Sequence, residues 1–238
     1  MLGTIVNFTA ILAGSILGLF LKGGISERFS NTIMQGIALC VLFIGISGSL
    51  KVDNFLIVIL SMAIGALLGE AIDIDKRLKN LGDKLQGRFK NSESKISEGF
   101  VSASLLFCVG AMAILGSLES GLHRNYDTLF SKSILDGIAS IIFSSTLGIG
   151  VAFSAVSVLL YQGAITLAAA YISPFLTTAV QNNMGAAGSL IIIGLGLNML
   201  GVTKIKVANL LPAIFLPILA VPVIHLGNLL YNYMIHLF

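Results

Sequence analysis

The chain has 238 residues, of which 56% are hydrophobic and only 11% are charged. An average soluble domain carries about a quarter charged residues, so this composition excludes an ordinary soluble domain. The net charge of +3 does not indicate a nucleic-acid partner, because the basic residues lie beside long apolar stretches, as in the cytoplasmic loops of membrane proteins. We therefore predict an all-α, polytopic bundle of about seven or eight transmembrane helices, with the lipid bilayer as solvent.

The first three spans are predicted at Thr4–Leu21, Thr32–Leu50 and Phe55–Ile72, within a first three-span unit of residues 1–72. The opening apolar run has no preceding basic residue, so it is interpreted as a retained span and not as a signal peptide. Residues 73–98 follow, with Leu78, Leu81, Leu85 and Phe89 at helical spacing among basic residues. This pattern predicts an amphipathic helix on the membrane surface; the alternative is an ordinary solvated helix.

Spans four and five are predicted at Phe100–Leu118 and Ile134–Ile149, within residues 99–150. A second three-span unit, residues 151–238, would hold spans Val151–Ile172, Val180–Leu200 and Asn209–Leu230. The turn between spans five and six is placed at Gly148-Ile149-Gly150, although one long helix there is the alternative. Pro212, Pro217 and Pro222 should kink or break the last span.

The basic residues give the orientation. The positive-inside rule places the loop of residues 73–98, with its cluster Lys76–Lys95, in the cytoplasm. Alternation then puts Lys22, Arg28, Lys204 and Lys206 inside as well. Lys51, Arg124, Lys132 and, with eight spans, both termini are predicted outside.

Two regions resemble each other at an offset of about 150 residues. Lys51-Val52-Asp53-Asn54-Phe55 corresponds to Lys206-Val207-Ala208-Asn209-Leu210, each after a similar apolar run that ends in Ile-Gly. If the match is real, spans one to three are repeated, inverted, as spans six to eight, a plan typical of secondary transporters. A chance match between apolar segments is the alternative.

Glycines also recur at a defined spacing within the spans. Gly14-x-x-x-Gly18 and Gly65-x-x-x-Gly69 each place two glycines on one helix face. This motif favours close helix packing or dimerisation, and we predict a homodimer packed through these glycine faces; the alternative is that the glycines line a pore.

Polar residues within the spans are candidates for substrate or ion binding. Glu70 and Asp136 are carboxylates in apolar segments, where a charge is costly unless it is paired, hydrated or protonated. The alternatives are that both reach the membrane interface or that they pair structurally with Lys132 or Arg28. Neutral groups that either join helices or line a substrate path complete the set: Asn7, Asn198, Asn209, Gln162, Ser144 and Ser145.

Catalytic and metal-binding motifs are not found in the sequence. Cys40 and Cys108 lie in apolar runs without a CxxC spacing and are interpreted as buried hydrophobic residues. We therefore expect no catalytic residue, no metal site and no cofactor, and we do not expect an enzyme.

The chain resembles a bacterial membrane family catalogued as domain of unknown function 554, the YqgA/YdfK-like proteins. The resemblance covers nearly the whole chain and is carried by Asn7 with Gly14, Glu27-Arg28, Leu68-Gly69-Glu70, Leu115-Gly116 through Gly121, Lys132-Ser133-x-x-Asp136, Leu147-Gly148-Ile149 and Asn209-Leu210-Leu211-Pro212-Ala213. It implies a bacterial cytoplasmic-membrane protein without an established activity, and it adds weight to Asn7, Glu70, Asp136 and Asn209.

Together these features predict a small secondary transporter or channel for a small solute or ion. Glu70 and Asp136 would bind a proton, a cation or a cationic group, and Asn7 and Asn209 would hold broken backbone or substrate. The alternative function is a non-transporting membrane scaffold or sensor that acts through the basic residues 76–95.

Overall fold

The computed structural model describes residues 1–22, 27–88 and 96–219, and every regular element in these ranges is helical. The elements are α1 Leu2–Lys22, α2 Glu27–Ser49, α3 Phe55–Ile72, α4 Ile74–Arg88, α5 Ile96–Cys108, α6 Ala111–Leu122, α7 Asp127–Leu147, α8 Gly150–Ile172, the short 3₁₀ helix η1 Ser173–Phe175, α9 Thr178–Met199 and the 3₁₀ helix η2 Val207–Ile214. The predicted all-α membrane bundle is confirmed.

Five of these helices are long and apolar enough to cross a membrane, and the bent pair α5–α6 brings the number to six. α7 carries Asp127, Lys132 and Asp136 and falls outside that set, although its 21 residues suffice to span. A shorter apolar segment, Val207–Leu219, leads into residues outside the described ranges. The number of spans is thus roughly that predicted from the sequence.

Three details differ from the sequence prediction. Span four is not one helix, because the chain bends by 58° between α5 and α6. Gly110 lies at this break with φ +145°, a conformation that side-chain-bearing residues rarely adopt. Span five begins at Asp127 and not at Ile134. Span eight begins as a 3₁₀ helix, because Pro212 lies inside η2 and lacks the amide hydrogen of a regular helix; Pro222 lies outside the described residues.

The predicted turn between spans five and six is present. α7 ends at Leu147, Gly148 has φ +80°, and α8 begins at Gly150. Because a positive φ favours glycine, this residue ends one helix and allows the next to return beside it. The alternative of a single long helix is excluded.

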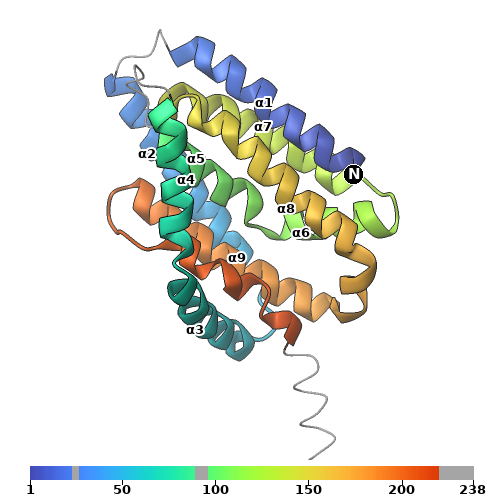
Figure 1. Ribbon diagram of the computed structural model, residues 1–238. Helices are drawn as coiled ribbons and strands as arrows, with labels where there is room; N and C mark the ends of the chain where they lie inside the picture. The colour runs from blue at the N-terminus through green and yellow to red at the C-terminus, as the bar shows by residue number, and fades with distance from the viewer. Residues whose placement is uncertain (23–26, 89–95, 220–238) are drawn as a thin grey trace, which may run out of the picture.

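The helices form two packed groups that share a core. α1, α7 and α8 lie side by side, with α5 and α6 against them (Figure 1). The second group pairs α2 with α9 and α3 with η2. α4 packs on α5 and runs at a steep angle to α8 (Figure 1). The inverted repeat of spans one to three as spans six to eight stays a prediction.

Both glycine motifs are close-packing faces within this one chain. An added Cβ at Gly14 would lie 2.2 Å from the carbonyl oxygen of Gly137, and one at Gly18 would lie 2.2 Å from that of Ile141. The Gly69 position would bring a Cβ to 1.8 Å from the carbonyl oxygen of Asn209. The glycine faces are therefore covered by α7 and η2 within the chain. The homodimer stays a prediction, and its two copies would have to meet through another surface.

The amphipathic α4 presents its basic side chains outwards. Lys76, Arg77, Lys79 and Lys84 are exposed, whereas Ile74 and Leu78 pack against the core. Leu81 is 50% exposed, and Phe89 of the predicted apolar face lies outside the described residues. The helix is amphipathic as predicted, and its attachment to the membrane surface stays a prediction.

Asn183 of α9 holds the start of α3. Its buried Oδ1 accepts hydrogen bonds from the backbone N–H groups of Asp53 (3.1 Å) and Asn54 (2.8 Å). Asn54 in turn caps α3, accepting from Leu56 and Ile57. We expect Asn183→Ala to lower the free energy of unfolding by about 1–2 kcal/mol, the typical loss of two neutral hydrogen bonds. Equilibrium unfolding in detergent micelles measures this, with Asn182→Ala as the matched control; equal values for the two variants would contradict the role of Asn183.

Candidate functional site

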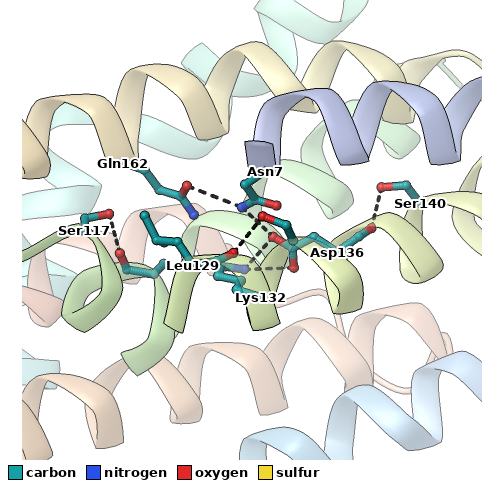
Figure 2. A network of polar contacts seen from close by, with 9 residues as sticks. Asn7, Ser117, Leu129, Lys132, Asp136, Ser140 and Gln162 are labelled. Carbon is teal, nitrogen blue, oxygen red and sulfur yellow. Dashed lines mark hydrogen bonds and ion pairs between the residues drawn. The ribbon is translucent and has the colours of Figure 1, made fainter. Parts of the chain in front are cut away.

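A buried polar cluster joins three helices at the centre of the first group. It consists of Asn7 from α1, Lys132 and Asp136 from α7, and Gln162 from α8 (Figure 2). Asn7 and Gln162 are 0% exposed, and Asp136 and Lys132 are 6% and 7% exposed. We call these four residues the Asp136 cluster.

Lys132 and Asp136 form an ion pair along α7. The Lys132 Nζ atom lies 2.8 Å from Asp136 Oδ1 and 2.6 Å from Oδ2. The two residues are four apart, which brings their side chains to neighbouring turns on one helix face. Lys132 is therefore not in an outer loop as predicted, and the alternative that Asp136 pairs with Lys132 is correct.

The two amides complete the cluster. Asn7 Nδ2 donates to Asp136 Oδ2 at 3.0 Å and to Gln162 Oε1 at 3.3 Å. An ionised carboxylate can only accept hydrogen bonds, so the Asn7 side chain must turn its amide nitrogen, and not its oxygen, towards Asp136. Asn7 Oδ1 and Gln162 Nε2 are then buried without a hydrogen-bond partner. Buried polar atoms are nearly always satisfied, so this acceptor and this donor beside an ion pair are atoms that a ligand or a water molecule could contact.

Asp136 and Gln162 lie near the middle of their helices, whereas Asn7 lies in the second turn of α1. At a rise of about 1.5 Å per residue, Asp136 is about 14 Å from the start of α7 and Gln162 about 18 Å from the start of α8. A hydrocarbon core is about 30 Å thick. Charges at that depth are costly and mark ion or substrate pathways by default.

Serine and threonine side chains extend the polar character of the three helices. Those of α7 recur at intervals of three or four residues around Asp136, at Ser133, Ser140 and Ser144, and all are buried. Each donates its hydroxyl hydrogen to a backbone carbonyl of its own helix or of its C-terminal cap, so its oxygen lone pairs remain available as acceptors. Buried hydroxyl oxygens without a partner lie on the neighbouring helices: Thr4, Ser15 and Thr166.

Glu70 belongs to a second cluster, at the end of α3. Its carboxylate accepts from Lys206 Nζ and, at 2.7 Å, from Asn209 Nδ2. The Glu70 and Lys206 side chains are 56% and 55% exposed, so this pair contributes little to stability. The hydrogen bond to Glu70 raises the pKa of Lys206. The partner of Glu70 is thus neither Lys132 nor Arg28.

Asn209 is a structural clamp. Besides donating to Glu70, it accepts from the backbone N–H of Asp75 at 2.7 Å, and it is 2% exposed. One amide therefore joins the end of α3, the start of α4 and the irregular η2. An open pocket of about 780 Å³ lies beside this clamp, lined by residues of α4, α5 and the 198–207 segment, such as Lys79, Ser97 and Lys204.

The remaining candidates have local roles. Asn198 accepts from the backbone N–H of Ile205 and donates to its carbonyl, and so closes the 200–206 loop. The hydroxyls of Ser144 and Ser145 donate to the carbonyls of Gly148 and Ile142. The structure thus unites Asn7, Asp136 and Gln162, and it places Glu70 with Asn209 elsewhere.

Sequence reasoning gave Lys132 only as an alternative structural partner and not as a member of the site, and it missed Ser133 and Ser140. The signal for Lys132 was its spacing of four from Asp136. The three-to-four spacing of Ser133, Asp136, Ser140 and Ser144 was a further sign that one face of α7 is polar and covered.

Comparisons with known proteins agree on the kind of protein. The family model described as "Protein of unknown function (DUF554)" matches residues 2–222. The chain is similar to "Uncharacterized membrane protein YdfK" of Bacillus subtilis (strain 168), with 37% identity over 94% of this chain and 97% of that protein. It is also similar to "Uncharacterized protein YqgA" of Escherichia coli (strain K12), with 30% identity over 90% of this chain and 94% of that protein. No solved structure matches the chain.

Proposed function

The chain belongs to the DUF554 family of membrane proteins, and we propose that it carries a small solute or ion across the cytoplasmic membrane of a bacterium, as a secondary transporter or channel. The Asp136 cluster supports the proposal most strongly. It buries an ion pair and two partly unsatisfied amides inside a bundle of apolar helices.

A purely structural cluster explains these contacts less well. An apolar replacement of a buried ion pair is often neutral or stabilising, so we expect that α1, α7 and α8 would still pack together without the two charges. The glycine contacts of α1 with α7 already supply close packing. Asn7 Oδ1 and Gln162 Nε2 are buried without a hydrogen-bond partner, which lowers the stability of the fold. A bound ligand that forms hydrogen bonds with them would offset that loss.

Asp136 is the proposed binding residue, Asn7 and Gln162 are its neighbours in the site, and Lys132 is its counter-ion. Glu70 and Asn209 would act at the mouth of the pathway, beside the open pocket at the end of α3. Asn198, Ser144 and Ser145 support the backbone around it. The proposal contains no catalytic step, metal or cofactor, and the loop of residues 73–98 would face the cytoplasm.

Efflux from proteoliposomes tests the proposal while the substrate is still unidentified. Vesicles are loaded with the low-molecular-mass fraction of a bacterial extract and its salts, and losses are measured by mass spectrometry and flame photometry. We expect one or a few species to leave vesicles that contain the wild-type chain and to be retained by Asp136→Asn. Asp127→Asn, an exposed site on the same helix, is the matched control and should behave as wild type. Losses no greater than from empty vesicles would overturn the proposal.

The alternative function, a scaffold or sensor, is favoured by one observation. α4 exposes four basic residues, while the helix itself packs against α5, η2 and α8. Pull-down of a partner that depends on these side chains and is unaffected by Asp136→Asn would favour this alternative. Glu70→Gln helps to separate the two functions, because lowered efflux in this variant supports a pathway that passes the end of α3.

A further inference from the structure

Buried polar side chains continue from the Asp136 cluster towards the end of the bundle at which α1 begins. On α1, Thr4 lies three residues before Asn7. On α8, Thr166 lies four residues after Gln162. Each spacing places the two side chains on one face of their helix. Thr4 and Thr166 are both buried, and neither hydroxyl oxygen has a hydrogen-bond partner among the described residues.

The two helix faces meet each other. α1 and α8 are in contact and run in opposite directions (Figure 1), and the hydrogen bond from Asn7 to Gln162 fixes their register. The step from Asn7 to Thr4 and the step from Gln162 to Thr166 therefore lead to the same end of the bundle. They cover about 4.5 and about 6 Å along the helix axes, at a rise of about 1.5 Å per residue.

This series of polar groups reaches the surface beside Met1. The backbone nitrogen of Met1, an exposed residue, donates to the hydroxyl of buried Ser120 on α6 at 3.4 Å. α6 packs closely on α8 at this level, because an added Cβ at Gly121 would lie 2.4 Å from the carbonyl oxygen of Thr166. We call Ser120, Thr4 and Thr166 the polar row. It joins the exposed start of α1 to the Asp136 cluster.

On the other side of the cluster, the same helix faces become apolar. One turn beyond Asn7 and Gln162, the fully buried Ile11 and Val158 pack in one apolar cluster with Phe107 and Phe143. The two phenylalanine rings meet edge to face, with centroids 6.4 Å apart. We call these four apolar side chains the apolar layer. Because apolar cavities and constrictions stay dry, the layer separates the Asp136 cluster from the end of the bundle at the α7–α8 turn.

The polar atoms without a partner match water. Asn7 Oδ1 can only accept a hydrogen bond and Gln162 Nε2 can only donate one, whereas the threonine hydroxyls can do both. A buried water molecule both donates and accepts, and it typically makes about three hydrogen bonds to such groups. A bare cation would satisfy only the acceptors, and an anion only the donors.

We infer that the polar row is a hydrated access path to the Asp136 cluster. It opens at the end of the bundle where α1 begins and is closed towards the other end by the apolar layer. The inference rests on the proposed function and names the side from which the transported species reaches Asp136.

The pocket beside Glu70 belongs to the closed end. It is lined by Ser97 and other residues of the first turns of α5, and α5 begins beside the start of α8, where Gly150 packs on Ile96. A species that passes from the polar row to this pocket therefore requires the apolar layer to separate, as in alternating access around a fixed site.

Cysteine accessibility tests the path in the full chain, in membrane vesicles, without a known substrate. Cys40 and Cys108 are replaced with alanine, and one cysteine is introduced at Thr4 or at Thr166. Ag⁺, a thiol-binding ion small enough to follow water, is added from one side in right-side-out or inverted vesicles. The cysteines that it leaves free are counted with a maleimide after denaturation. We expect both cysteines to bind Ag⁺ from one side of the membrane only.

Thr9→Cys is the matched control, because Thr9 lies on the exposed, lipid-facing side of the same helix. We expect Thr4→Cys to react at least about tenfold faster than Thr9→Cys, since a thiol in apolar surroundings stays protonated and inert. Val158→Cys, in the apolar layer, should be as slow as Thr9→Cys. Thr166→Cys provides the same comparison on α8 if Thr4→Cys does not fold.

The inference is overturned if the folded path variants react no faster than Thr9→Cys, or if they react equally from both sides. Efflux that requires Asp136, through a chain whose path cysteines do not react, would remove the inference and leave the proposed function intact. One-sided reaction at Thr4→Cys and Thr166→Cys, without efflux from wild-type vesicles, would support the hydrated path and overturn the proposed function.

Discussion

Replacement of Asp136 with alanine is expected to lower the free energy of unfolding by about 3–5 kcal/mol, because it leaves the Lys132 ammonium buried without a partner. Lys132 is 7% exposed and its only described partner is Asp136. Unfolding of the purified chain in mixed detergent micelles measures the loss. The double variant Lys132→Met/Asp136→Leu removes both charges and should lie close to the wild-type value or above it.

The single and double variants together separate the effect of losing the ion pair from the effect of leaving one buried charge unpaired. A large loss in the single variant together with a small change in the double variant identifies an unpaired buried charge as the cause. A loss below about 1 kcal/mol for Asp136→Ala would mean that water or another group reaches Lys132, since exposed ion pairs contribute no more than that. Such a result would contradict the burial of the cluster.

Substitution of the glycines on the face of α1 that packs against α7 is expected to give the second large loss of unfolding free energy. Gly14→Ala and Gly18→Ala each place a methyl group 2.2 Å from a backbone carbonyl oxygen of α7, so the two helices must separate. We expect each variant to lose about 1–3 kcal/mol of unfolding free energy, the usual cost of overpacking. Gly36→Ala is the matched control, because Gly36 lies in the membrane helix α2 with no atom within 4 Å of an added Cβ.

The unfolding free energy of the control variant should not fall. Alanine is favoured over glycine in a helix by about 1 kcal/mol, so Gly36→Ala should be neutral or slightly stabilising. Unfolding in the same micelles measures all three variants. If Gly14→Ala behaves as Gly36→Ala does, α1 and α7 do not pack through glycine as described.

Periodicity and composition predicted most of the helices. Apolar runs such as Phe55–Ile72 were bounded correctly, because a charged turn ends them on both sides. The break at Gly110 was missed, since a glycine within an apolar run does not by itself show whether the backbone adopts a positive φ. Lys132 was placed in an outer loop because span five was predicted to begin only at Ile134, although its pairing with Asp136 was one of the alternatives.

The candidate site was predicted in part, for a physical reason. Sequence alone marks Asn7, Asp136 and Gln162 as costly polar groups in apolar helices. Their separations of 129 and 155 residues can be joined only by the packing of three helices, which pairwise spacing does not encode. Glu70 and Asn209 looked equivalent to them in sequence, yet their contacts place them at a helix end, where they clamp the backbone.

The central claim is that the Asp136 cluster serves binding and transport and is not needed for folding. The most direct test is efflux through the Lys132→Met/Asp136→Leu variant in proteoliposomes, at matched protein content and after its unfolding free energy has been measured. We predict a variant that is as stable as the wild type and retains the species that the wild type releases. A stable variant that releases them at the wild-type rate would contradict the claim.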